Sequence, residues 1–96
     1  MTSKDRAYLR SLANPVEPIF QIGKSGISDN LIKQLDDALE ARELIKITVL
    51  ETAPEDSRDL ANEIAEKTKS VVVQVMGKKI TLYRKKKKDS KIGINV

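Results

Sequence analysis

Apolar residues recur three or four positions apart in three stretches of this chain, with polar residues between them. The stretches are residues 3–13, 29–42 and 54–68. This spacing places the apolar side chains on one face of a helix, so it predicts three amphipathic helices. Each predicted helix therefore has one face to bury against another element.

Each predicted helix is preceded by a residue that can accept a hydrogen bond from the first free N–H groups. The expected N-caps are Thr2 or Ser3 for the first helix, Ser28 for the second and Thr52 for the third. Residues 52–55 (Thr-Ala-Pro-Glu) have the pattern of a capping box with an early proline. Asn14 and Pro15 are expected to end the first helix, because Asn tolerates a left-handed cap and Pro cannot continue a helix.

Short runs rich in β-branched residues predict four strands, at residues 19–22, 44–50, 71–76 and 80–84. Gly77-Lys78-Lys79 is typical of a hairpin turn between the last two strands. The element order is then α-β-α-β-α-β-β. Helical crossovers imply parallel pairing, and the closing hairpin implies one antiparallel pair. The expected fold class is α/β, a mixed four-stranded sheet packed with helices.

The loop between the first predicted strand and the second predicted helix reads Gly23-Lys24-Ser25-Gly26. Two glycines let a backbone bend tightly and approach a ligand closely. The following helix directs its free N–H groups and positive dipole end toward the loop, which suits an anion such as phosphate. The alternative is a plain strand-to-helix turn that needs two flexible residues, and spacing alone leaves both interpretations open. Ile19 excludes a mononucleotide P-loop, and Asp29 excludes a dinucleotide fingerprint, because each stands where that motif requires glycine.

Composition excludes several classes of function. At 96 residues the chain is expected to form one domain with a modest core. It contains no Cys and no His, which removes thiolate chemistry, the usual general base and the usual metal ligand. We therefore expect no enzyme activity, no metal and no cofactor. No apolar run approaches transmembrane length and the N-terminus is not signal-like, so we expect a cytoplasmic protein without a membrane partner.

The net charge of +4 conceals a strong asymmetry along the chain. Residues 1–28 carry a formal charge of +2, residues 29–66 carry −7, and residues 67–96 carry +9. The basic end should attract a polyanion, while the acidic segment should repel it. Residues 85–96 contain a lysine run and are expected to form a basic, flexible tail that follows a domain of residues 1–84.

Three segments together resemble a known family. They are Ile22-Gly23-Lys24-Ser25-Gly26-Ile27, Glu43-Leu44-Ile45-Lys46-Ile47, and Met76-Gly77-Lys78-Lys79-Ile80-Thr81-Leu82-Tyr83-Arg84. In this order and spacing the chain is similar to the CRM domain (chloroplast RNA splicing and ribosome maturation), in particular to its bacterial stand-alone YhbY-like members. The resemblance covers roughly residues 3–84. One departure is Lys69-Ser70, where the family often has glycine before the third strand.

The resemblance implies a fold like the C-terminal domain of translation initiation factor 3, with an added N-terminal helix. It implies the strand order 1-2-4-3, with strand 4 antiparallel to the others. The family binds structured RNA, and its bacterial single-domain members associate with precursors of the large ribosomal subunit. The implied partner is therefore large-subunit ribosomal RNA or its precursor particle, bound by a monomer. The implied RNA-contacting loop is Gly23, Lys24, Ser25 and Gly26.

Other basic residues are further candidates for RNA contact. They are Lys78, Lys79, Arg84, Lys85, Lys86, Lys87 and Lys88. Lys78 and Lys79 either contact RNA or are only solvated residues of a turn. A lysine run joined to an RNA-binding fold is expected to add affinity for the RNA backbone. The aromatics are only Tyr8, Phe20 and Tyr83, too few for a base-stacking platform, so binding should depend on backbone and shape.

The acidic residues 29–66 leave a second function open. Their helical face either solubilises the domain or docks a basic protein partner, which would make the chain a protein-interaction adaptor. Salt-dependent binding to ribosomal RNA fragments would separate an RNA-binding module from such an adaptor.

Overall fold

The computed structural model describes residues 2–86. It contains the predicted elements in the predicted order. They are α1 (Ser3–Ala13), β1 (Phe20–Ile22), α2 (Asp29–Arg42), β2 (Leu44–Val49), α3 (Ser57–Thr68), β3 (Val71–Met76) and β4 (Lys79–Tyr83). The expected boundaries of the strands differ from these by one residue or less, as is usual where strand ends fray.

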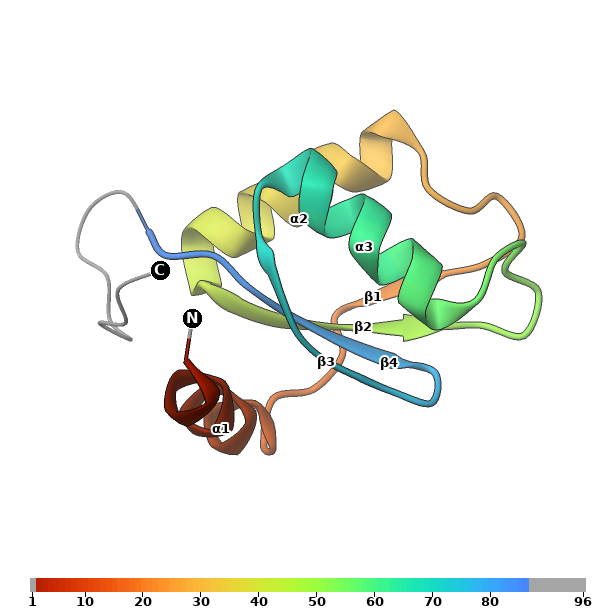
Figure 1. The fold of residues 1–96 in the computed structure, drawn as a ribbon. Coiled ribbons are helices and arrows are strands. Elements are labelled where there is room, and N and C mark those ends of the chain that lie inside the picture. The colour runs from red at the N-terminus through yellow and green to blue at the C-terminus, as the bar shows by residue number, and fades with distance from the viewer. Residues whose placement is uncertain (1, 87–96) are drawn as a thin grey trace.

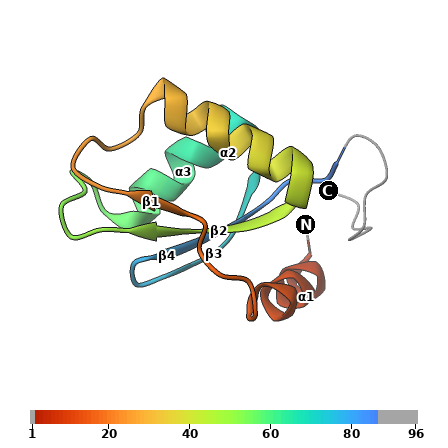
Figure 2. The same ribbon diagram turned by 180° about the vertical axis from the view of Figure 1, so that it is seen from behind.

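The four strands form one mixed sheet in the order β1-β2-β4-β3 (Figure 1). β1 pairs with β2 in parallel, and β4 pairs antiparallel with both β2 and β3. This confirms the expected fold class and strand order. α2 and α3 cover one face of the sheet, and α1 lies on the other, as the two opposite views show (Figure 2).

The main core lies between the sheet and the α2–α3 layer. Leu35 and Leu39 of α2 and Ile64 of α3 pack there against the apolar face of β2 and β4. Alternate residues of β2, Ile45 and Ile47, are fully buried in this layer, because successive strand side chains point to opposite faces. The helical stripes therefore bury the surfaces that their spacing predicted.

A smaller second core fixes α1 to the opposite face. Leu9 and Ala13 of α1 pack against Leu44, Val73 and Tyr83 of the sheet. The register of β3 shifts between Val72 and Gln74, which is a β-bulge. Such a bulge leaves backbone groups outside the regular ladder, and here an arginine of α1 contacts them.

Arg6 of α1 binds the bulged segment of β3. One of its guanidinium nitrogens donates hydrogen bonds to the carbonyl oxygens of Val72 and Val73, at 2.8 and 2.9 Å. β3 lies at an edge of the sheet, where unpaired carbonyl groups would otherwise face solvent or another strand. Arg6 therefore both attaches α1 and protects this edge.

The start of the third helix was wrongly predicted. Thr52 does not cap it; α3 begins at Ser57, and the side chain of Asp56 accepts a 2.9 Å hydrogen bond from the Asp59 N–H. The chain after β2 first turns back, with the Ala53 N–H donating to the Leu50 carbonyl. Asp is as good an N-cap as Ser or Thr, so Asp56 satisfies the free N–H groups at the later start. The predicted caps Thr2 and Ser28 are confirmed.

The ends of α1 and α3 use different backbone conformations from those expected. Asn14 caps α1 in the right-handed conformation rather than the left-handed one. Lys69 caps α3 in the left-handed conformation, with φ of 56°, and the Ser70 N–H donates to the Ala65 carbonyl at 2.9 Å. The lysine thus forms the turn that glycine commonly forms at a helix C-terminus, at some conformational cost.

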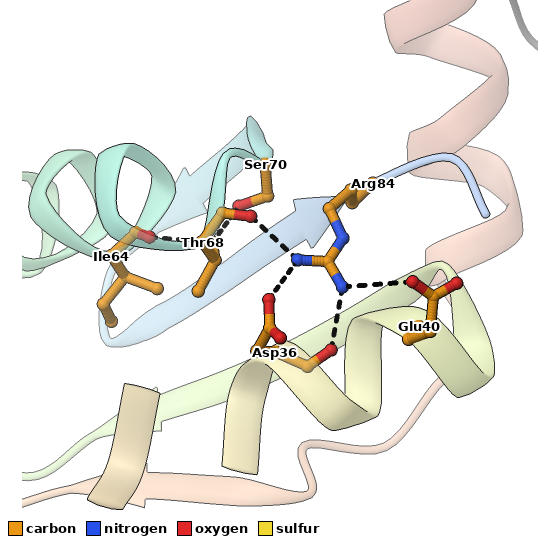
Figure 3. Close-up of polar contacts among 6 residues, drawn as sticks. All are labelled: Asp36, Glu40, Ile64, Thr68, Ser70 and Arg84. Carbon is orange, nitrogen blue, oxygen red and sulfur yellow. Dashed lines mark hydrogen bonds and ion pairs between the residues drawn. The ribbon is translucent and has the colours of Figure 1, made fainter. Parts of the chain in front are cut away.

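Arg84, which follows β4, connects three elements (Figure 3). Its guanidinium pairs with the Asp36 carboxylate, donates to the Thr68 carbonyl at 2.8 Å and donates to the Asp36 carbonyl at 2.9 Å. A nitrogen of the same group also lies 3.8 Å from Glu40. The planar fork of arginine suits several acceptors at once, so Arg84 holds the end of β4 against α2 and α3.

Replacement of Arg84 should therefore destabilise the fold. Arg84→Met keeps much of the apolar stem but removes every donor, and we expect the free energy of unfolding to fall by about 2 kcal/mol, the size of a few charge-assisted hydrogen bonds. Urea denaturation would measure the change. Lys67→Met is the matched control, because Lys67 makes only an exposed 4.0 Å pair with Glu63 and should change stability by less than about 0.5 kcal/mol. Equal effects of the two variants would contradict the role assigned to Arg84.

Candidate nucleic-acid interface

The β1–α2 loop is a tight turn with two exposed residues at its tip. The Gly26 N–H donates a 2.9 Å hydrogen bond to the Gly23 carbonyl, which closes the turn. Gly26 has a φ of +64°, a conformation that side chains disfavour. Lys24 and Ser25 occupy the two central positions, and both are exposed. The turn thus presents an ammonium and a hydroxyl to solvent.

Packing against the β2–α3 loop accounts for one of the two glycines, Gly26. A Cβ on Gly26 would lie 3.1 Å from the ring of Pro54, and a Cβ on Gly23 would lie 3.4 Å from the side chains of Leu50 and Thr52. A side chain at either position would thus point toward the β2–α3 loop rather than toward an outside ligand. The conformation of Gly26 therefore fits the turn, and the side chains of Lys24 and Ser25 are the ones that the turn presents outward.

The N-terminus of α2 lies directly after this turn. The Ser28 hydroxyl accepts a 3.1 Å hydrogen bond from the Leu31 N–H, which satisfies one of the free donors of the helix. Asp29 occupies the first turn and partly balances the positive end of the helix dipole. Attraction for an anion at this loop therefore comes mainly from Lys24.

A hollow of about 320 Å³ lies between the loop and the first turns of α2. Besides the loop itself, its lining includes the amide side chains of Gln21, Asn30 and Gln34. Amides can both donate and accept hydrogen bonds, so they suit ribose hydroxyls and base edges. Sequence reasoning missed these three residues. The four-residue spacing of Asn30 and Gln34, on one face of the helix after the loop, was the available signal.

Three loops meet at this end of the sheet, as Figure 1 shows for the β1–α2, β2–α3 and β3–β4 connections. The Leu50 N–H donates to the Ile22 carbonyl at 2.8 Å, and the Val49 N–H donates to the Lys78 carbonyl at 2.7 Å. These bonds place the Gly23–Gly26 turn and the hairpin on either side of the end of β2. The structure therefore brings Lys24, Lys78 and Lys79 to one end of the molecule.

Arg84, Lys85 and Lys86 lie at the opposite end of the sheet. β4 runs from Lys79 to Tyr83. Five strand residues span about 17 Å, so Arg84 lies about that distance from the hairpin. Arg84 is engaged with α2 and α3, whereas Lys85 is exposed and Lys86 half-buried. Lys87, Lys88 and the predicted flexible tail fall outside the described residues.

Many of the acidic residues occupy the outer surface of the helical layer, while Glu51 and Glu55 are exposed in the β2–α3 loop. Exposed carboxylates on the helical layer belong to Asp29, Asp36, Asp37, Glu40, Asp59 and Glu66. In the part of the chain that the structure describes, no group of three or more carboxylates is arranged to hold a metal ion. No helix within the same residues is long and apolar enough to cross a membrane.

Comparisons with known proteins give a consistent result. The family model of the CRS1 / YhbY (CRM) domain matches residues 1–84. Probable RNA-binding protein YqeI of Bacillus subtilis is 46% identical over 92 residues, which cover 96% of each chain. An RNA-binding protein of Haemophilus influenzae is 30% identical over 88% of this chain and 85% of its own length. The solution structure of the hypothetical protein SAV1595 from Staphylococcus aureus, a candidate RNA-binding protein, has a TM-score of 0.82 and 49% identity, with 99% of each chain covered.

The turn geometry predicts that the three glycines near these loops differ in their tolerance of alanine. Gly26→Ala should lower the free energy of unfolding most, by about 2 kcal/mol, because it combines positive φ with a close Pro54 contact. Gly77→Ala, at a φ of +58° but in open space, should cost about 1 kcal/mol. Gly23→Ala should cost less than about 0.5 kcal/mol, because its φ is not positive and its neighbours stand at ordinary contact distance. Denaturant titration of the three variants would test this ranking, and a reversed order would contradict it.

Proposed function

The chain belongs to the CRS1 / YhbY (CRM) domain family, and we propose that it is an RNA-binding module that holds structured RNA through the tip of its β1–α2 loop. The family consists of RNA-binding proteins and not of enzymes, in agreement with the expectation from the missing Cys and His. The relatives named above as RNA-binding proteins support this proposal.

The observation that carries the proposal is the position of Lys24. Its side chain is exposed at the tip of a closed turn, beside a hollow lined by amides and at the end of the sheet that also bears Lys78. A lysine ammonium is a compact point charge that contacts phosphate without reading base identity. Gln21, Asn30 and Gln34 then supply hydrogen bonds to ribose or base edges beside that phosphate.

The aromatic residues favour contact with the backbone and shape of a folded RNA. Tyr83 is fully buried under α1, and Phe20 packs on the main core. Tyr8 is 46% exposed but stands alone on α1. Base-stacking recognition of single strands needs several exposed rings on one surface. This arrangement supports binding of folded RNA in preference to unpaired bases.

We further assign the RNA to the large ribosomal subunit or its precursor, and the role of the protein to assembly of that subunit. The support is the likeness to the stand-alone bacterial members of the family. The match to the Bacillus subtilis relative covers 96% of that protein. On this assignment the protein acts as a monomer in the cytoplasm, without a cofactor.

The second candidate function is a protein-interaction adaptor that uses the acidic helical face of residues 29–66. The gathering of carboxylates on the outer surface of α2 and α3 favours it. Two of these carboxylates, on Asp36 and Glu40, already face Arg84 within the chain, which reduces the charge available to a basic partner. RNA binding that depends on Lys24 would decide for the first function.

Lys24→Ala should weaken binding to all RNAs by a similar factor of about ten, and should lower the slope of log affinity against log salt by about 1, because one phosphate contact is lost. The measurement is a salt series on a folded fragment of large-subunit ribosomal RNA and on an RNA hairpin of unrelated sequence. Ser25→Asp should weaken binding further, since it places a carboxylate at the exposed tip without changing the glycines.

Lys33→Ala is the matched control for Lys24→Ala, because Lys33 is an exposed lysine of α2 that does not line the hollow. It should leave affinity and salt slope nearly unchanged. A folded Lys24→Ala protein with unaltered affinity for both RNAs would remove the loop from the binding site. An altered preference between the two RNAs at constant slope would show that Lys24 reads bases.

A chain that ends at Lys86 tests the proposed contribution of the basic tail. The missing residues 87–96 contain three lysines and one aspartate, so the formal net charge falls from +4 to +2. We expect weaker binding to both RNAs, a salt slope lower by about 2 and an unchanged preference between them, because such charges act through counterion release. A changed ratio of the two affinities would give the tail a role in recognition, and an earlier thermal melt would give it a role in the fold.

A further inference from the structure

Part of the sheet face that carries α1 is left uncovered by that helix. α1 packs on the end of this face where Leu44 and Tyr83 pair across β2 and β4. In the view of Figure 1, α1 lies below one half of the sheet, while the hairpin half extends past it. The register of the strands identifies the residues that share the uncovered half.

Two rows of paired residues extend across the sheet beyond α1. One row joins Gln21, Thr48, Lys79 and Met76, and the next joins Lys46, Thr81 and Gln74. Paired residues point to the same side, and every second residue of β2 from Leu44 onward faces α1. We call the accessible part of these rows the open sheet face. It consists of Gln21, Lys46, Thr48, Gln74, Met76 and Lys79.

The open sheet face is basic and contains no acidic residue. A hollow of about 170 Å³ lies on it, and both Lys46 and Lys79 line this hollow. The Lys79 ammonium donates to the Thr48 hydroxyl at 3.1 Å, which leaves further donors available. Lys46 is half-buried in the middle of the sheet, and within residues 2–86 its ammonium has no hydrogen-bond or ion-pair partner. A half-buried cation without a counter-charge is favourable to an incoming anion.

The open sheet face continues directly into the loop site. Gln21 belongs to the first cross-strand row and also lines the hollow beside Lys24 and Ser25. Lys79 belongs to the same row and lies at the hairpin, next to Lys78. A polyanion bound at the loop can therefore extend across the sheet without passing the acidic surface of α2 and α3.

We propose that the open sheet face is a second RNA-contacting surface, which receives the sugar–phosphate backbone of the RNA that the β1–α2 loop holds. This inference rests on the proposed function. Lys46 and Lys79 contact phosphates, and the side-chain amides of Gln21 and Gln74 contact ribose hydroxyls. Among residues 2–86, Tyr83 is the one aromatic residue paired into this face of the sheet, and it is buried under α1. The surface therefore binds backbone and does not stack bases.

The decisive variant is Lys46→Gln in the full chain, with the same ribosomal RNA fragment and unrelated RNA hairpin as probes. We expect affinity for both RNAs to fall about three- to tenfold and the salt slope to fall by about 1. Lys46→Arg keeps the positive charge and should restore both the affinity and the salt slope. If only the aliphatic stem of Lys46 mattered, Lys46→Arg and Lys46→Gln would behave alike. Lys33→Gln on the helical face is the matched control and should change neither.

The double variant with Lys24→Ala and Lys46→Gln separates the two proposals. If loop and sheet face bind separate phosphates of one RNA, the two losses in affinity should multiply. If Lys24→Ala weakens binding while folded Lys46→Gln matches the unaltered protein, the sheet face is not part of the site and only the present inference fails. If neither variant changes affinity, the proposed function fails as well. A thermal melt of each variant confirms that it is folded.

Discussion

The insertion of β4 between β2 and β3 determines where the charged groups of this protein lie. Because β4 is antiparallel to both neighbours, it must start where β2 and β3 end, and the short hairpin follows from that pairing. The hairpin lysines are thereby placed beside the turn that follows β1, and the chain after β4 leaves from the far end of the sheet. One pairing pattern thus separates the basic residues into two groups.

The same sheet also separates acidic from basic surfaces. The main core requires α2 and α3 on one face, and their outward sides carry the carboxylates. The other face carries α1 and, beyond it, lysines and amides. Charges of this kind attract a polyanion to the face that bears the lysines and repel it from the helical layer. The strong charge asymmetry of the sequence thus becomes an asymmetry between two faces.

Local signals predicted the elements well, because amphipathic spacing, β-branched runs and caps such as Ser28 act over a few residues. They failed at the start of α3, where Asp56 and not the predicted Thr52 caps the helix. Thr52 and Pro54 instead lie beside Gly23 and Gly26. The site was predicted in part. The Gly-Lys-Ser-Gly turn is readable from sequence, but its closeness to the hairpin, and the amides beside it, arise from strand pairing between distant segments.

The structure also explains why basic residues of this chain differ in their availability to a polyanion. Arg6 and Arg84 both donate to several acceptors within the chain, on the β3 bulge, on Asp36 in the middle of α2 and at the end of α3. The rigid fork of arginine suits such fixed, multiple acceptors, whereas lysine is a flexible point charge that loses little by facing solvent. Lys24 and Lys78 stand exposed at the loop end. Each of these four residues contributes equally to the net charge. The geometry of their donors nevertheless gives the arginines a role in the fold and leaves the lysines available to a polyanion.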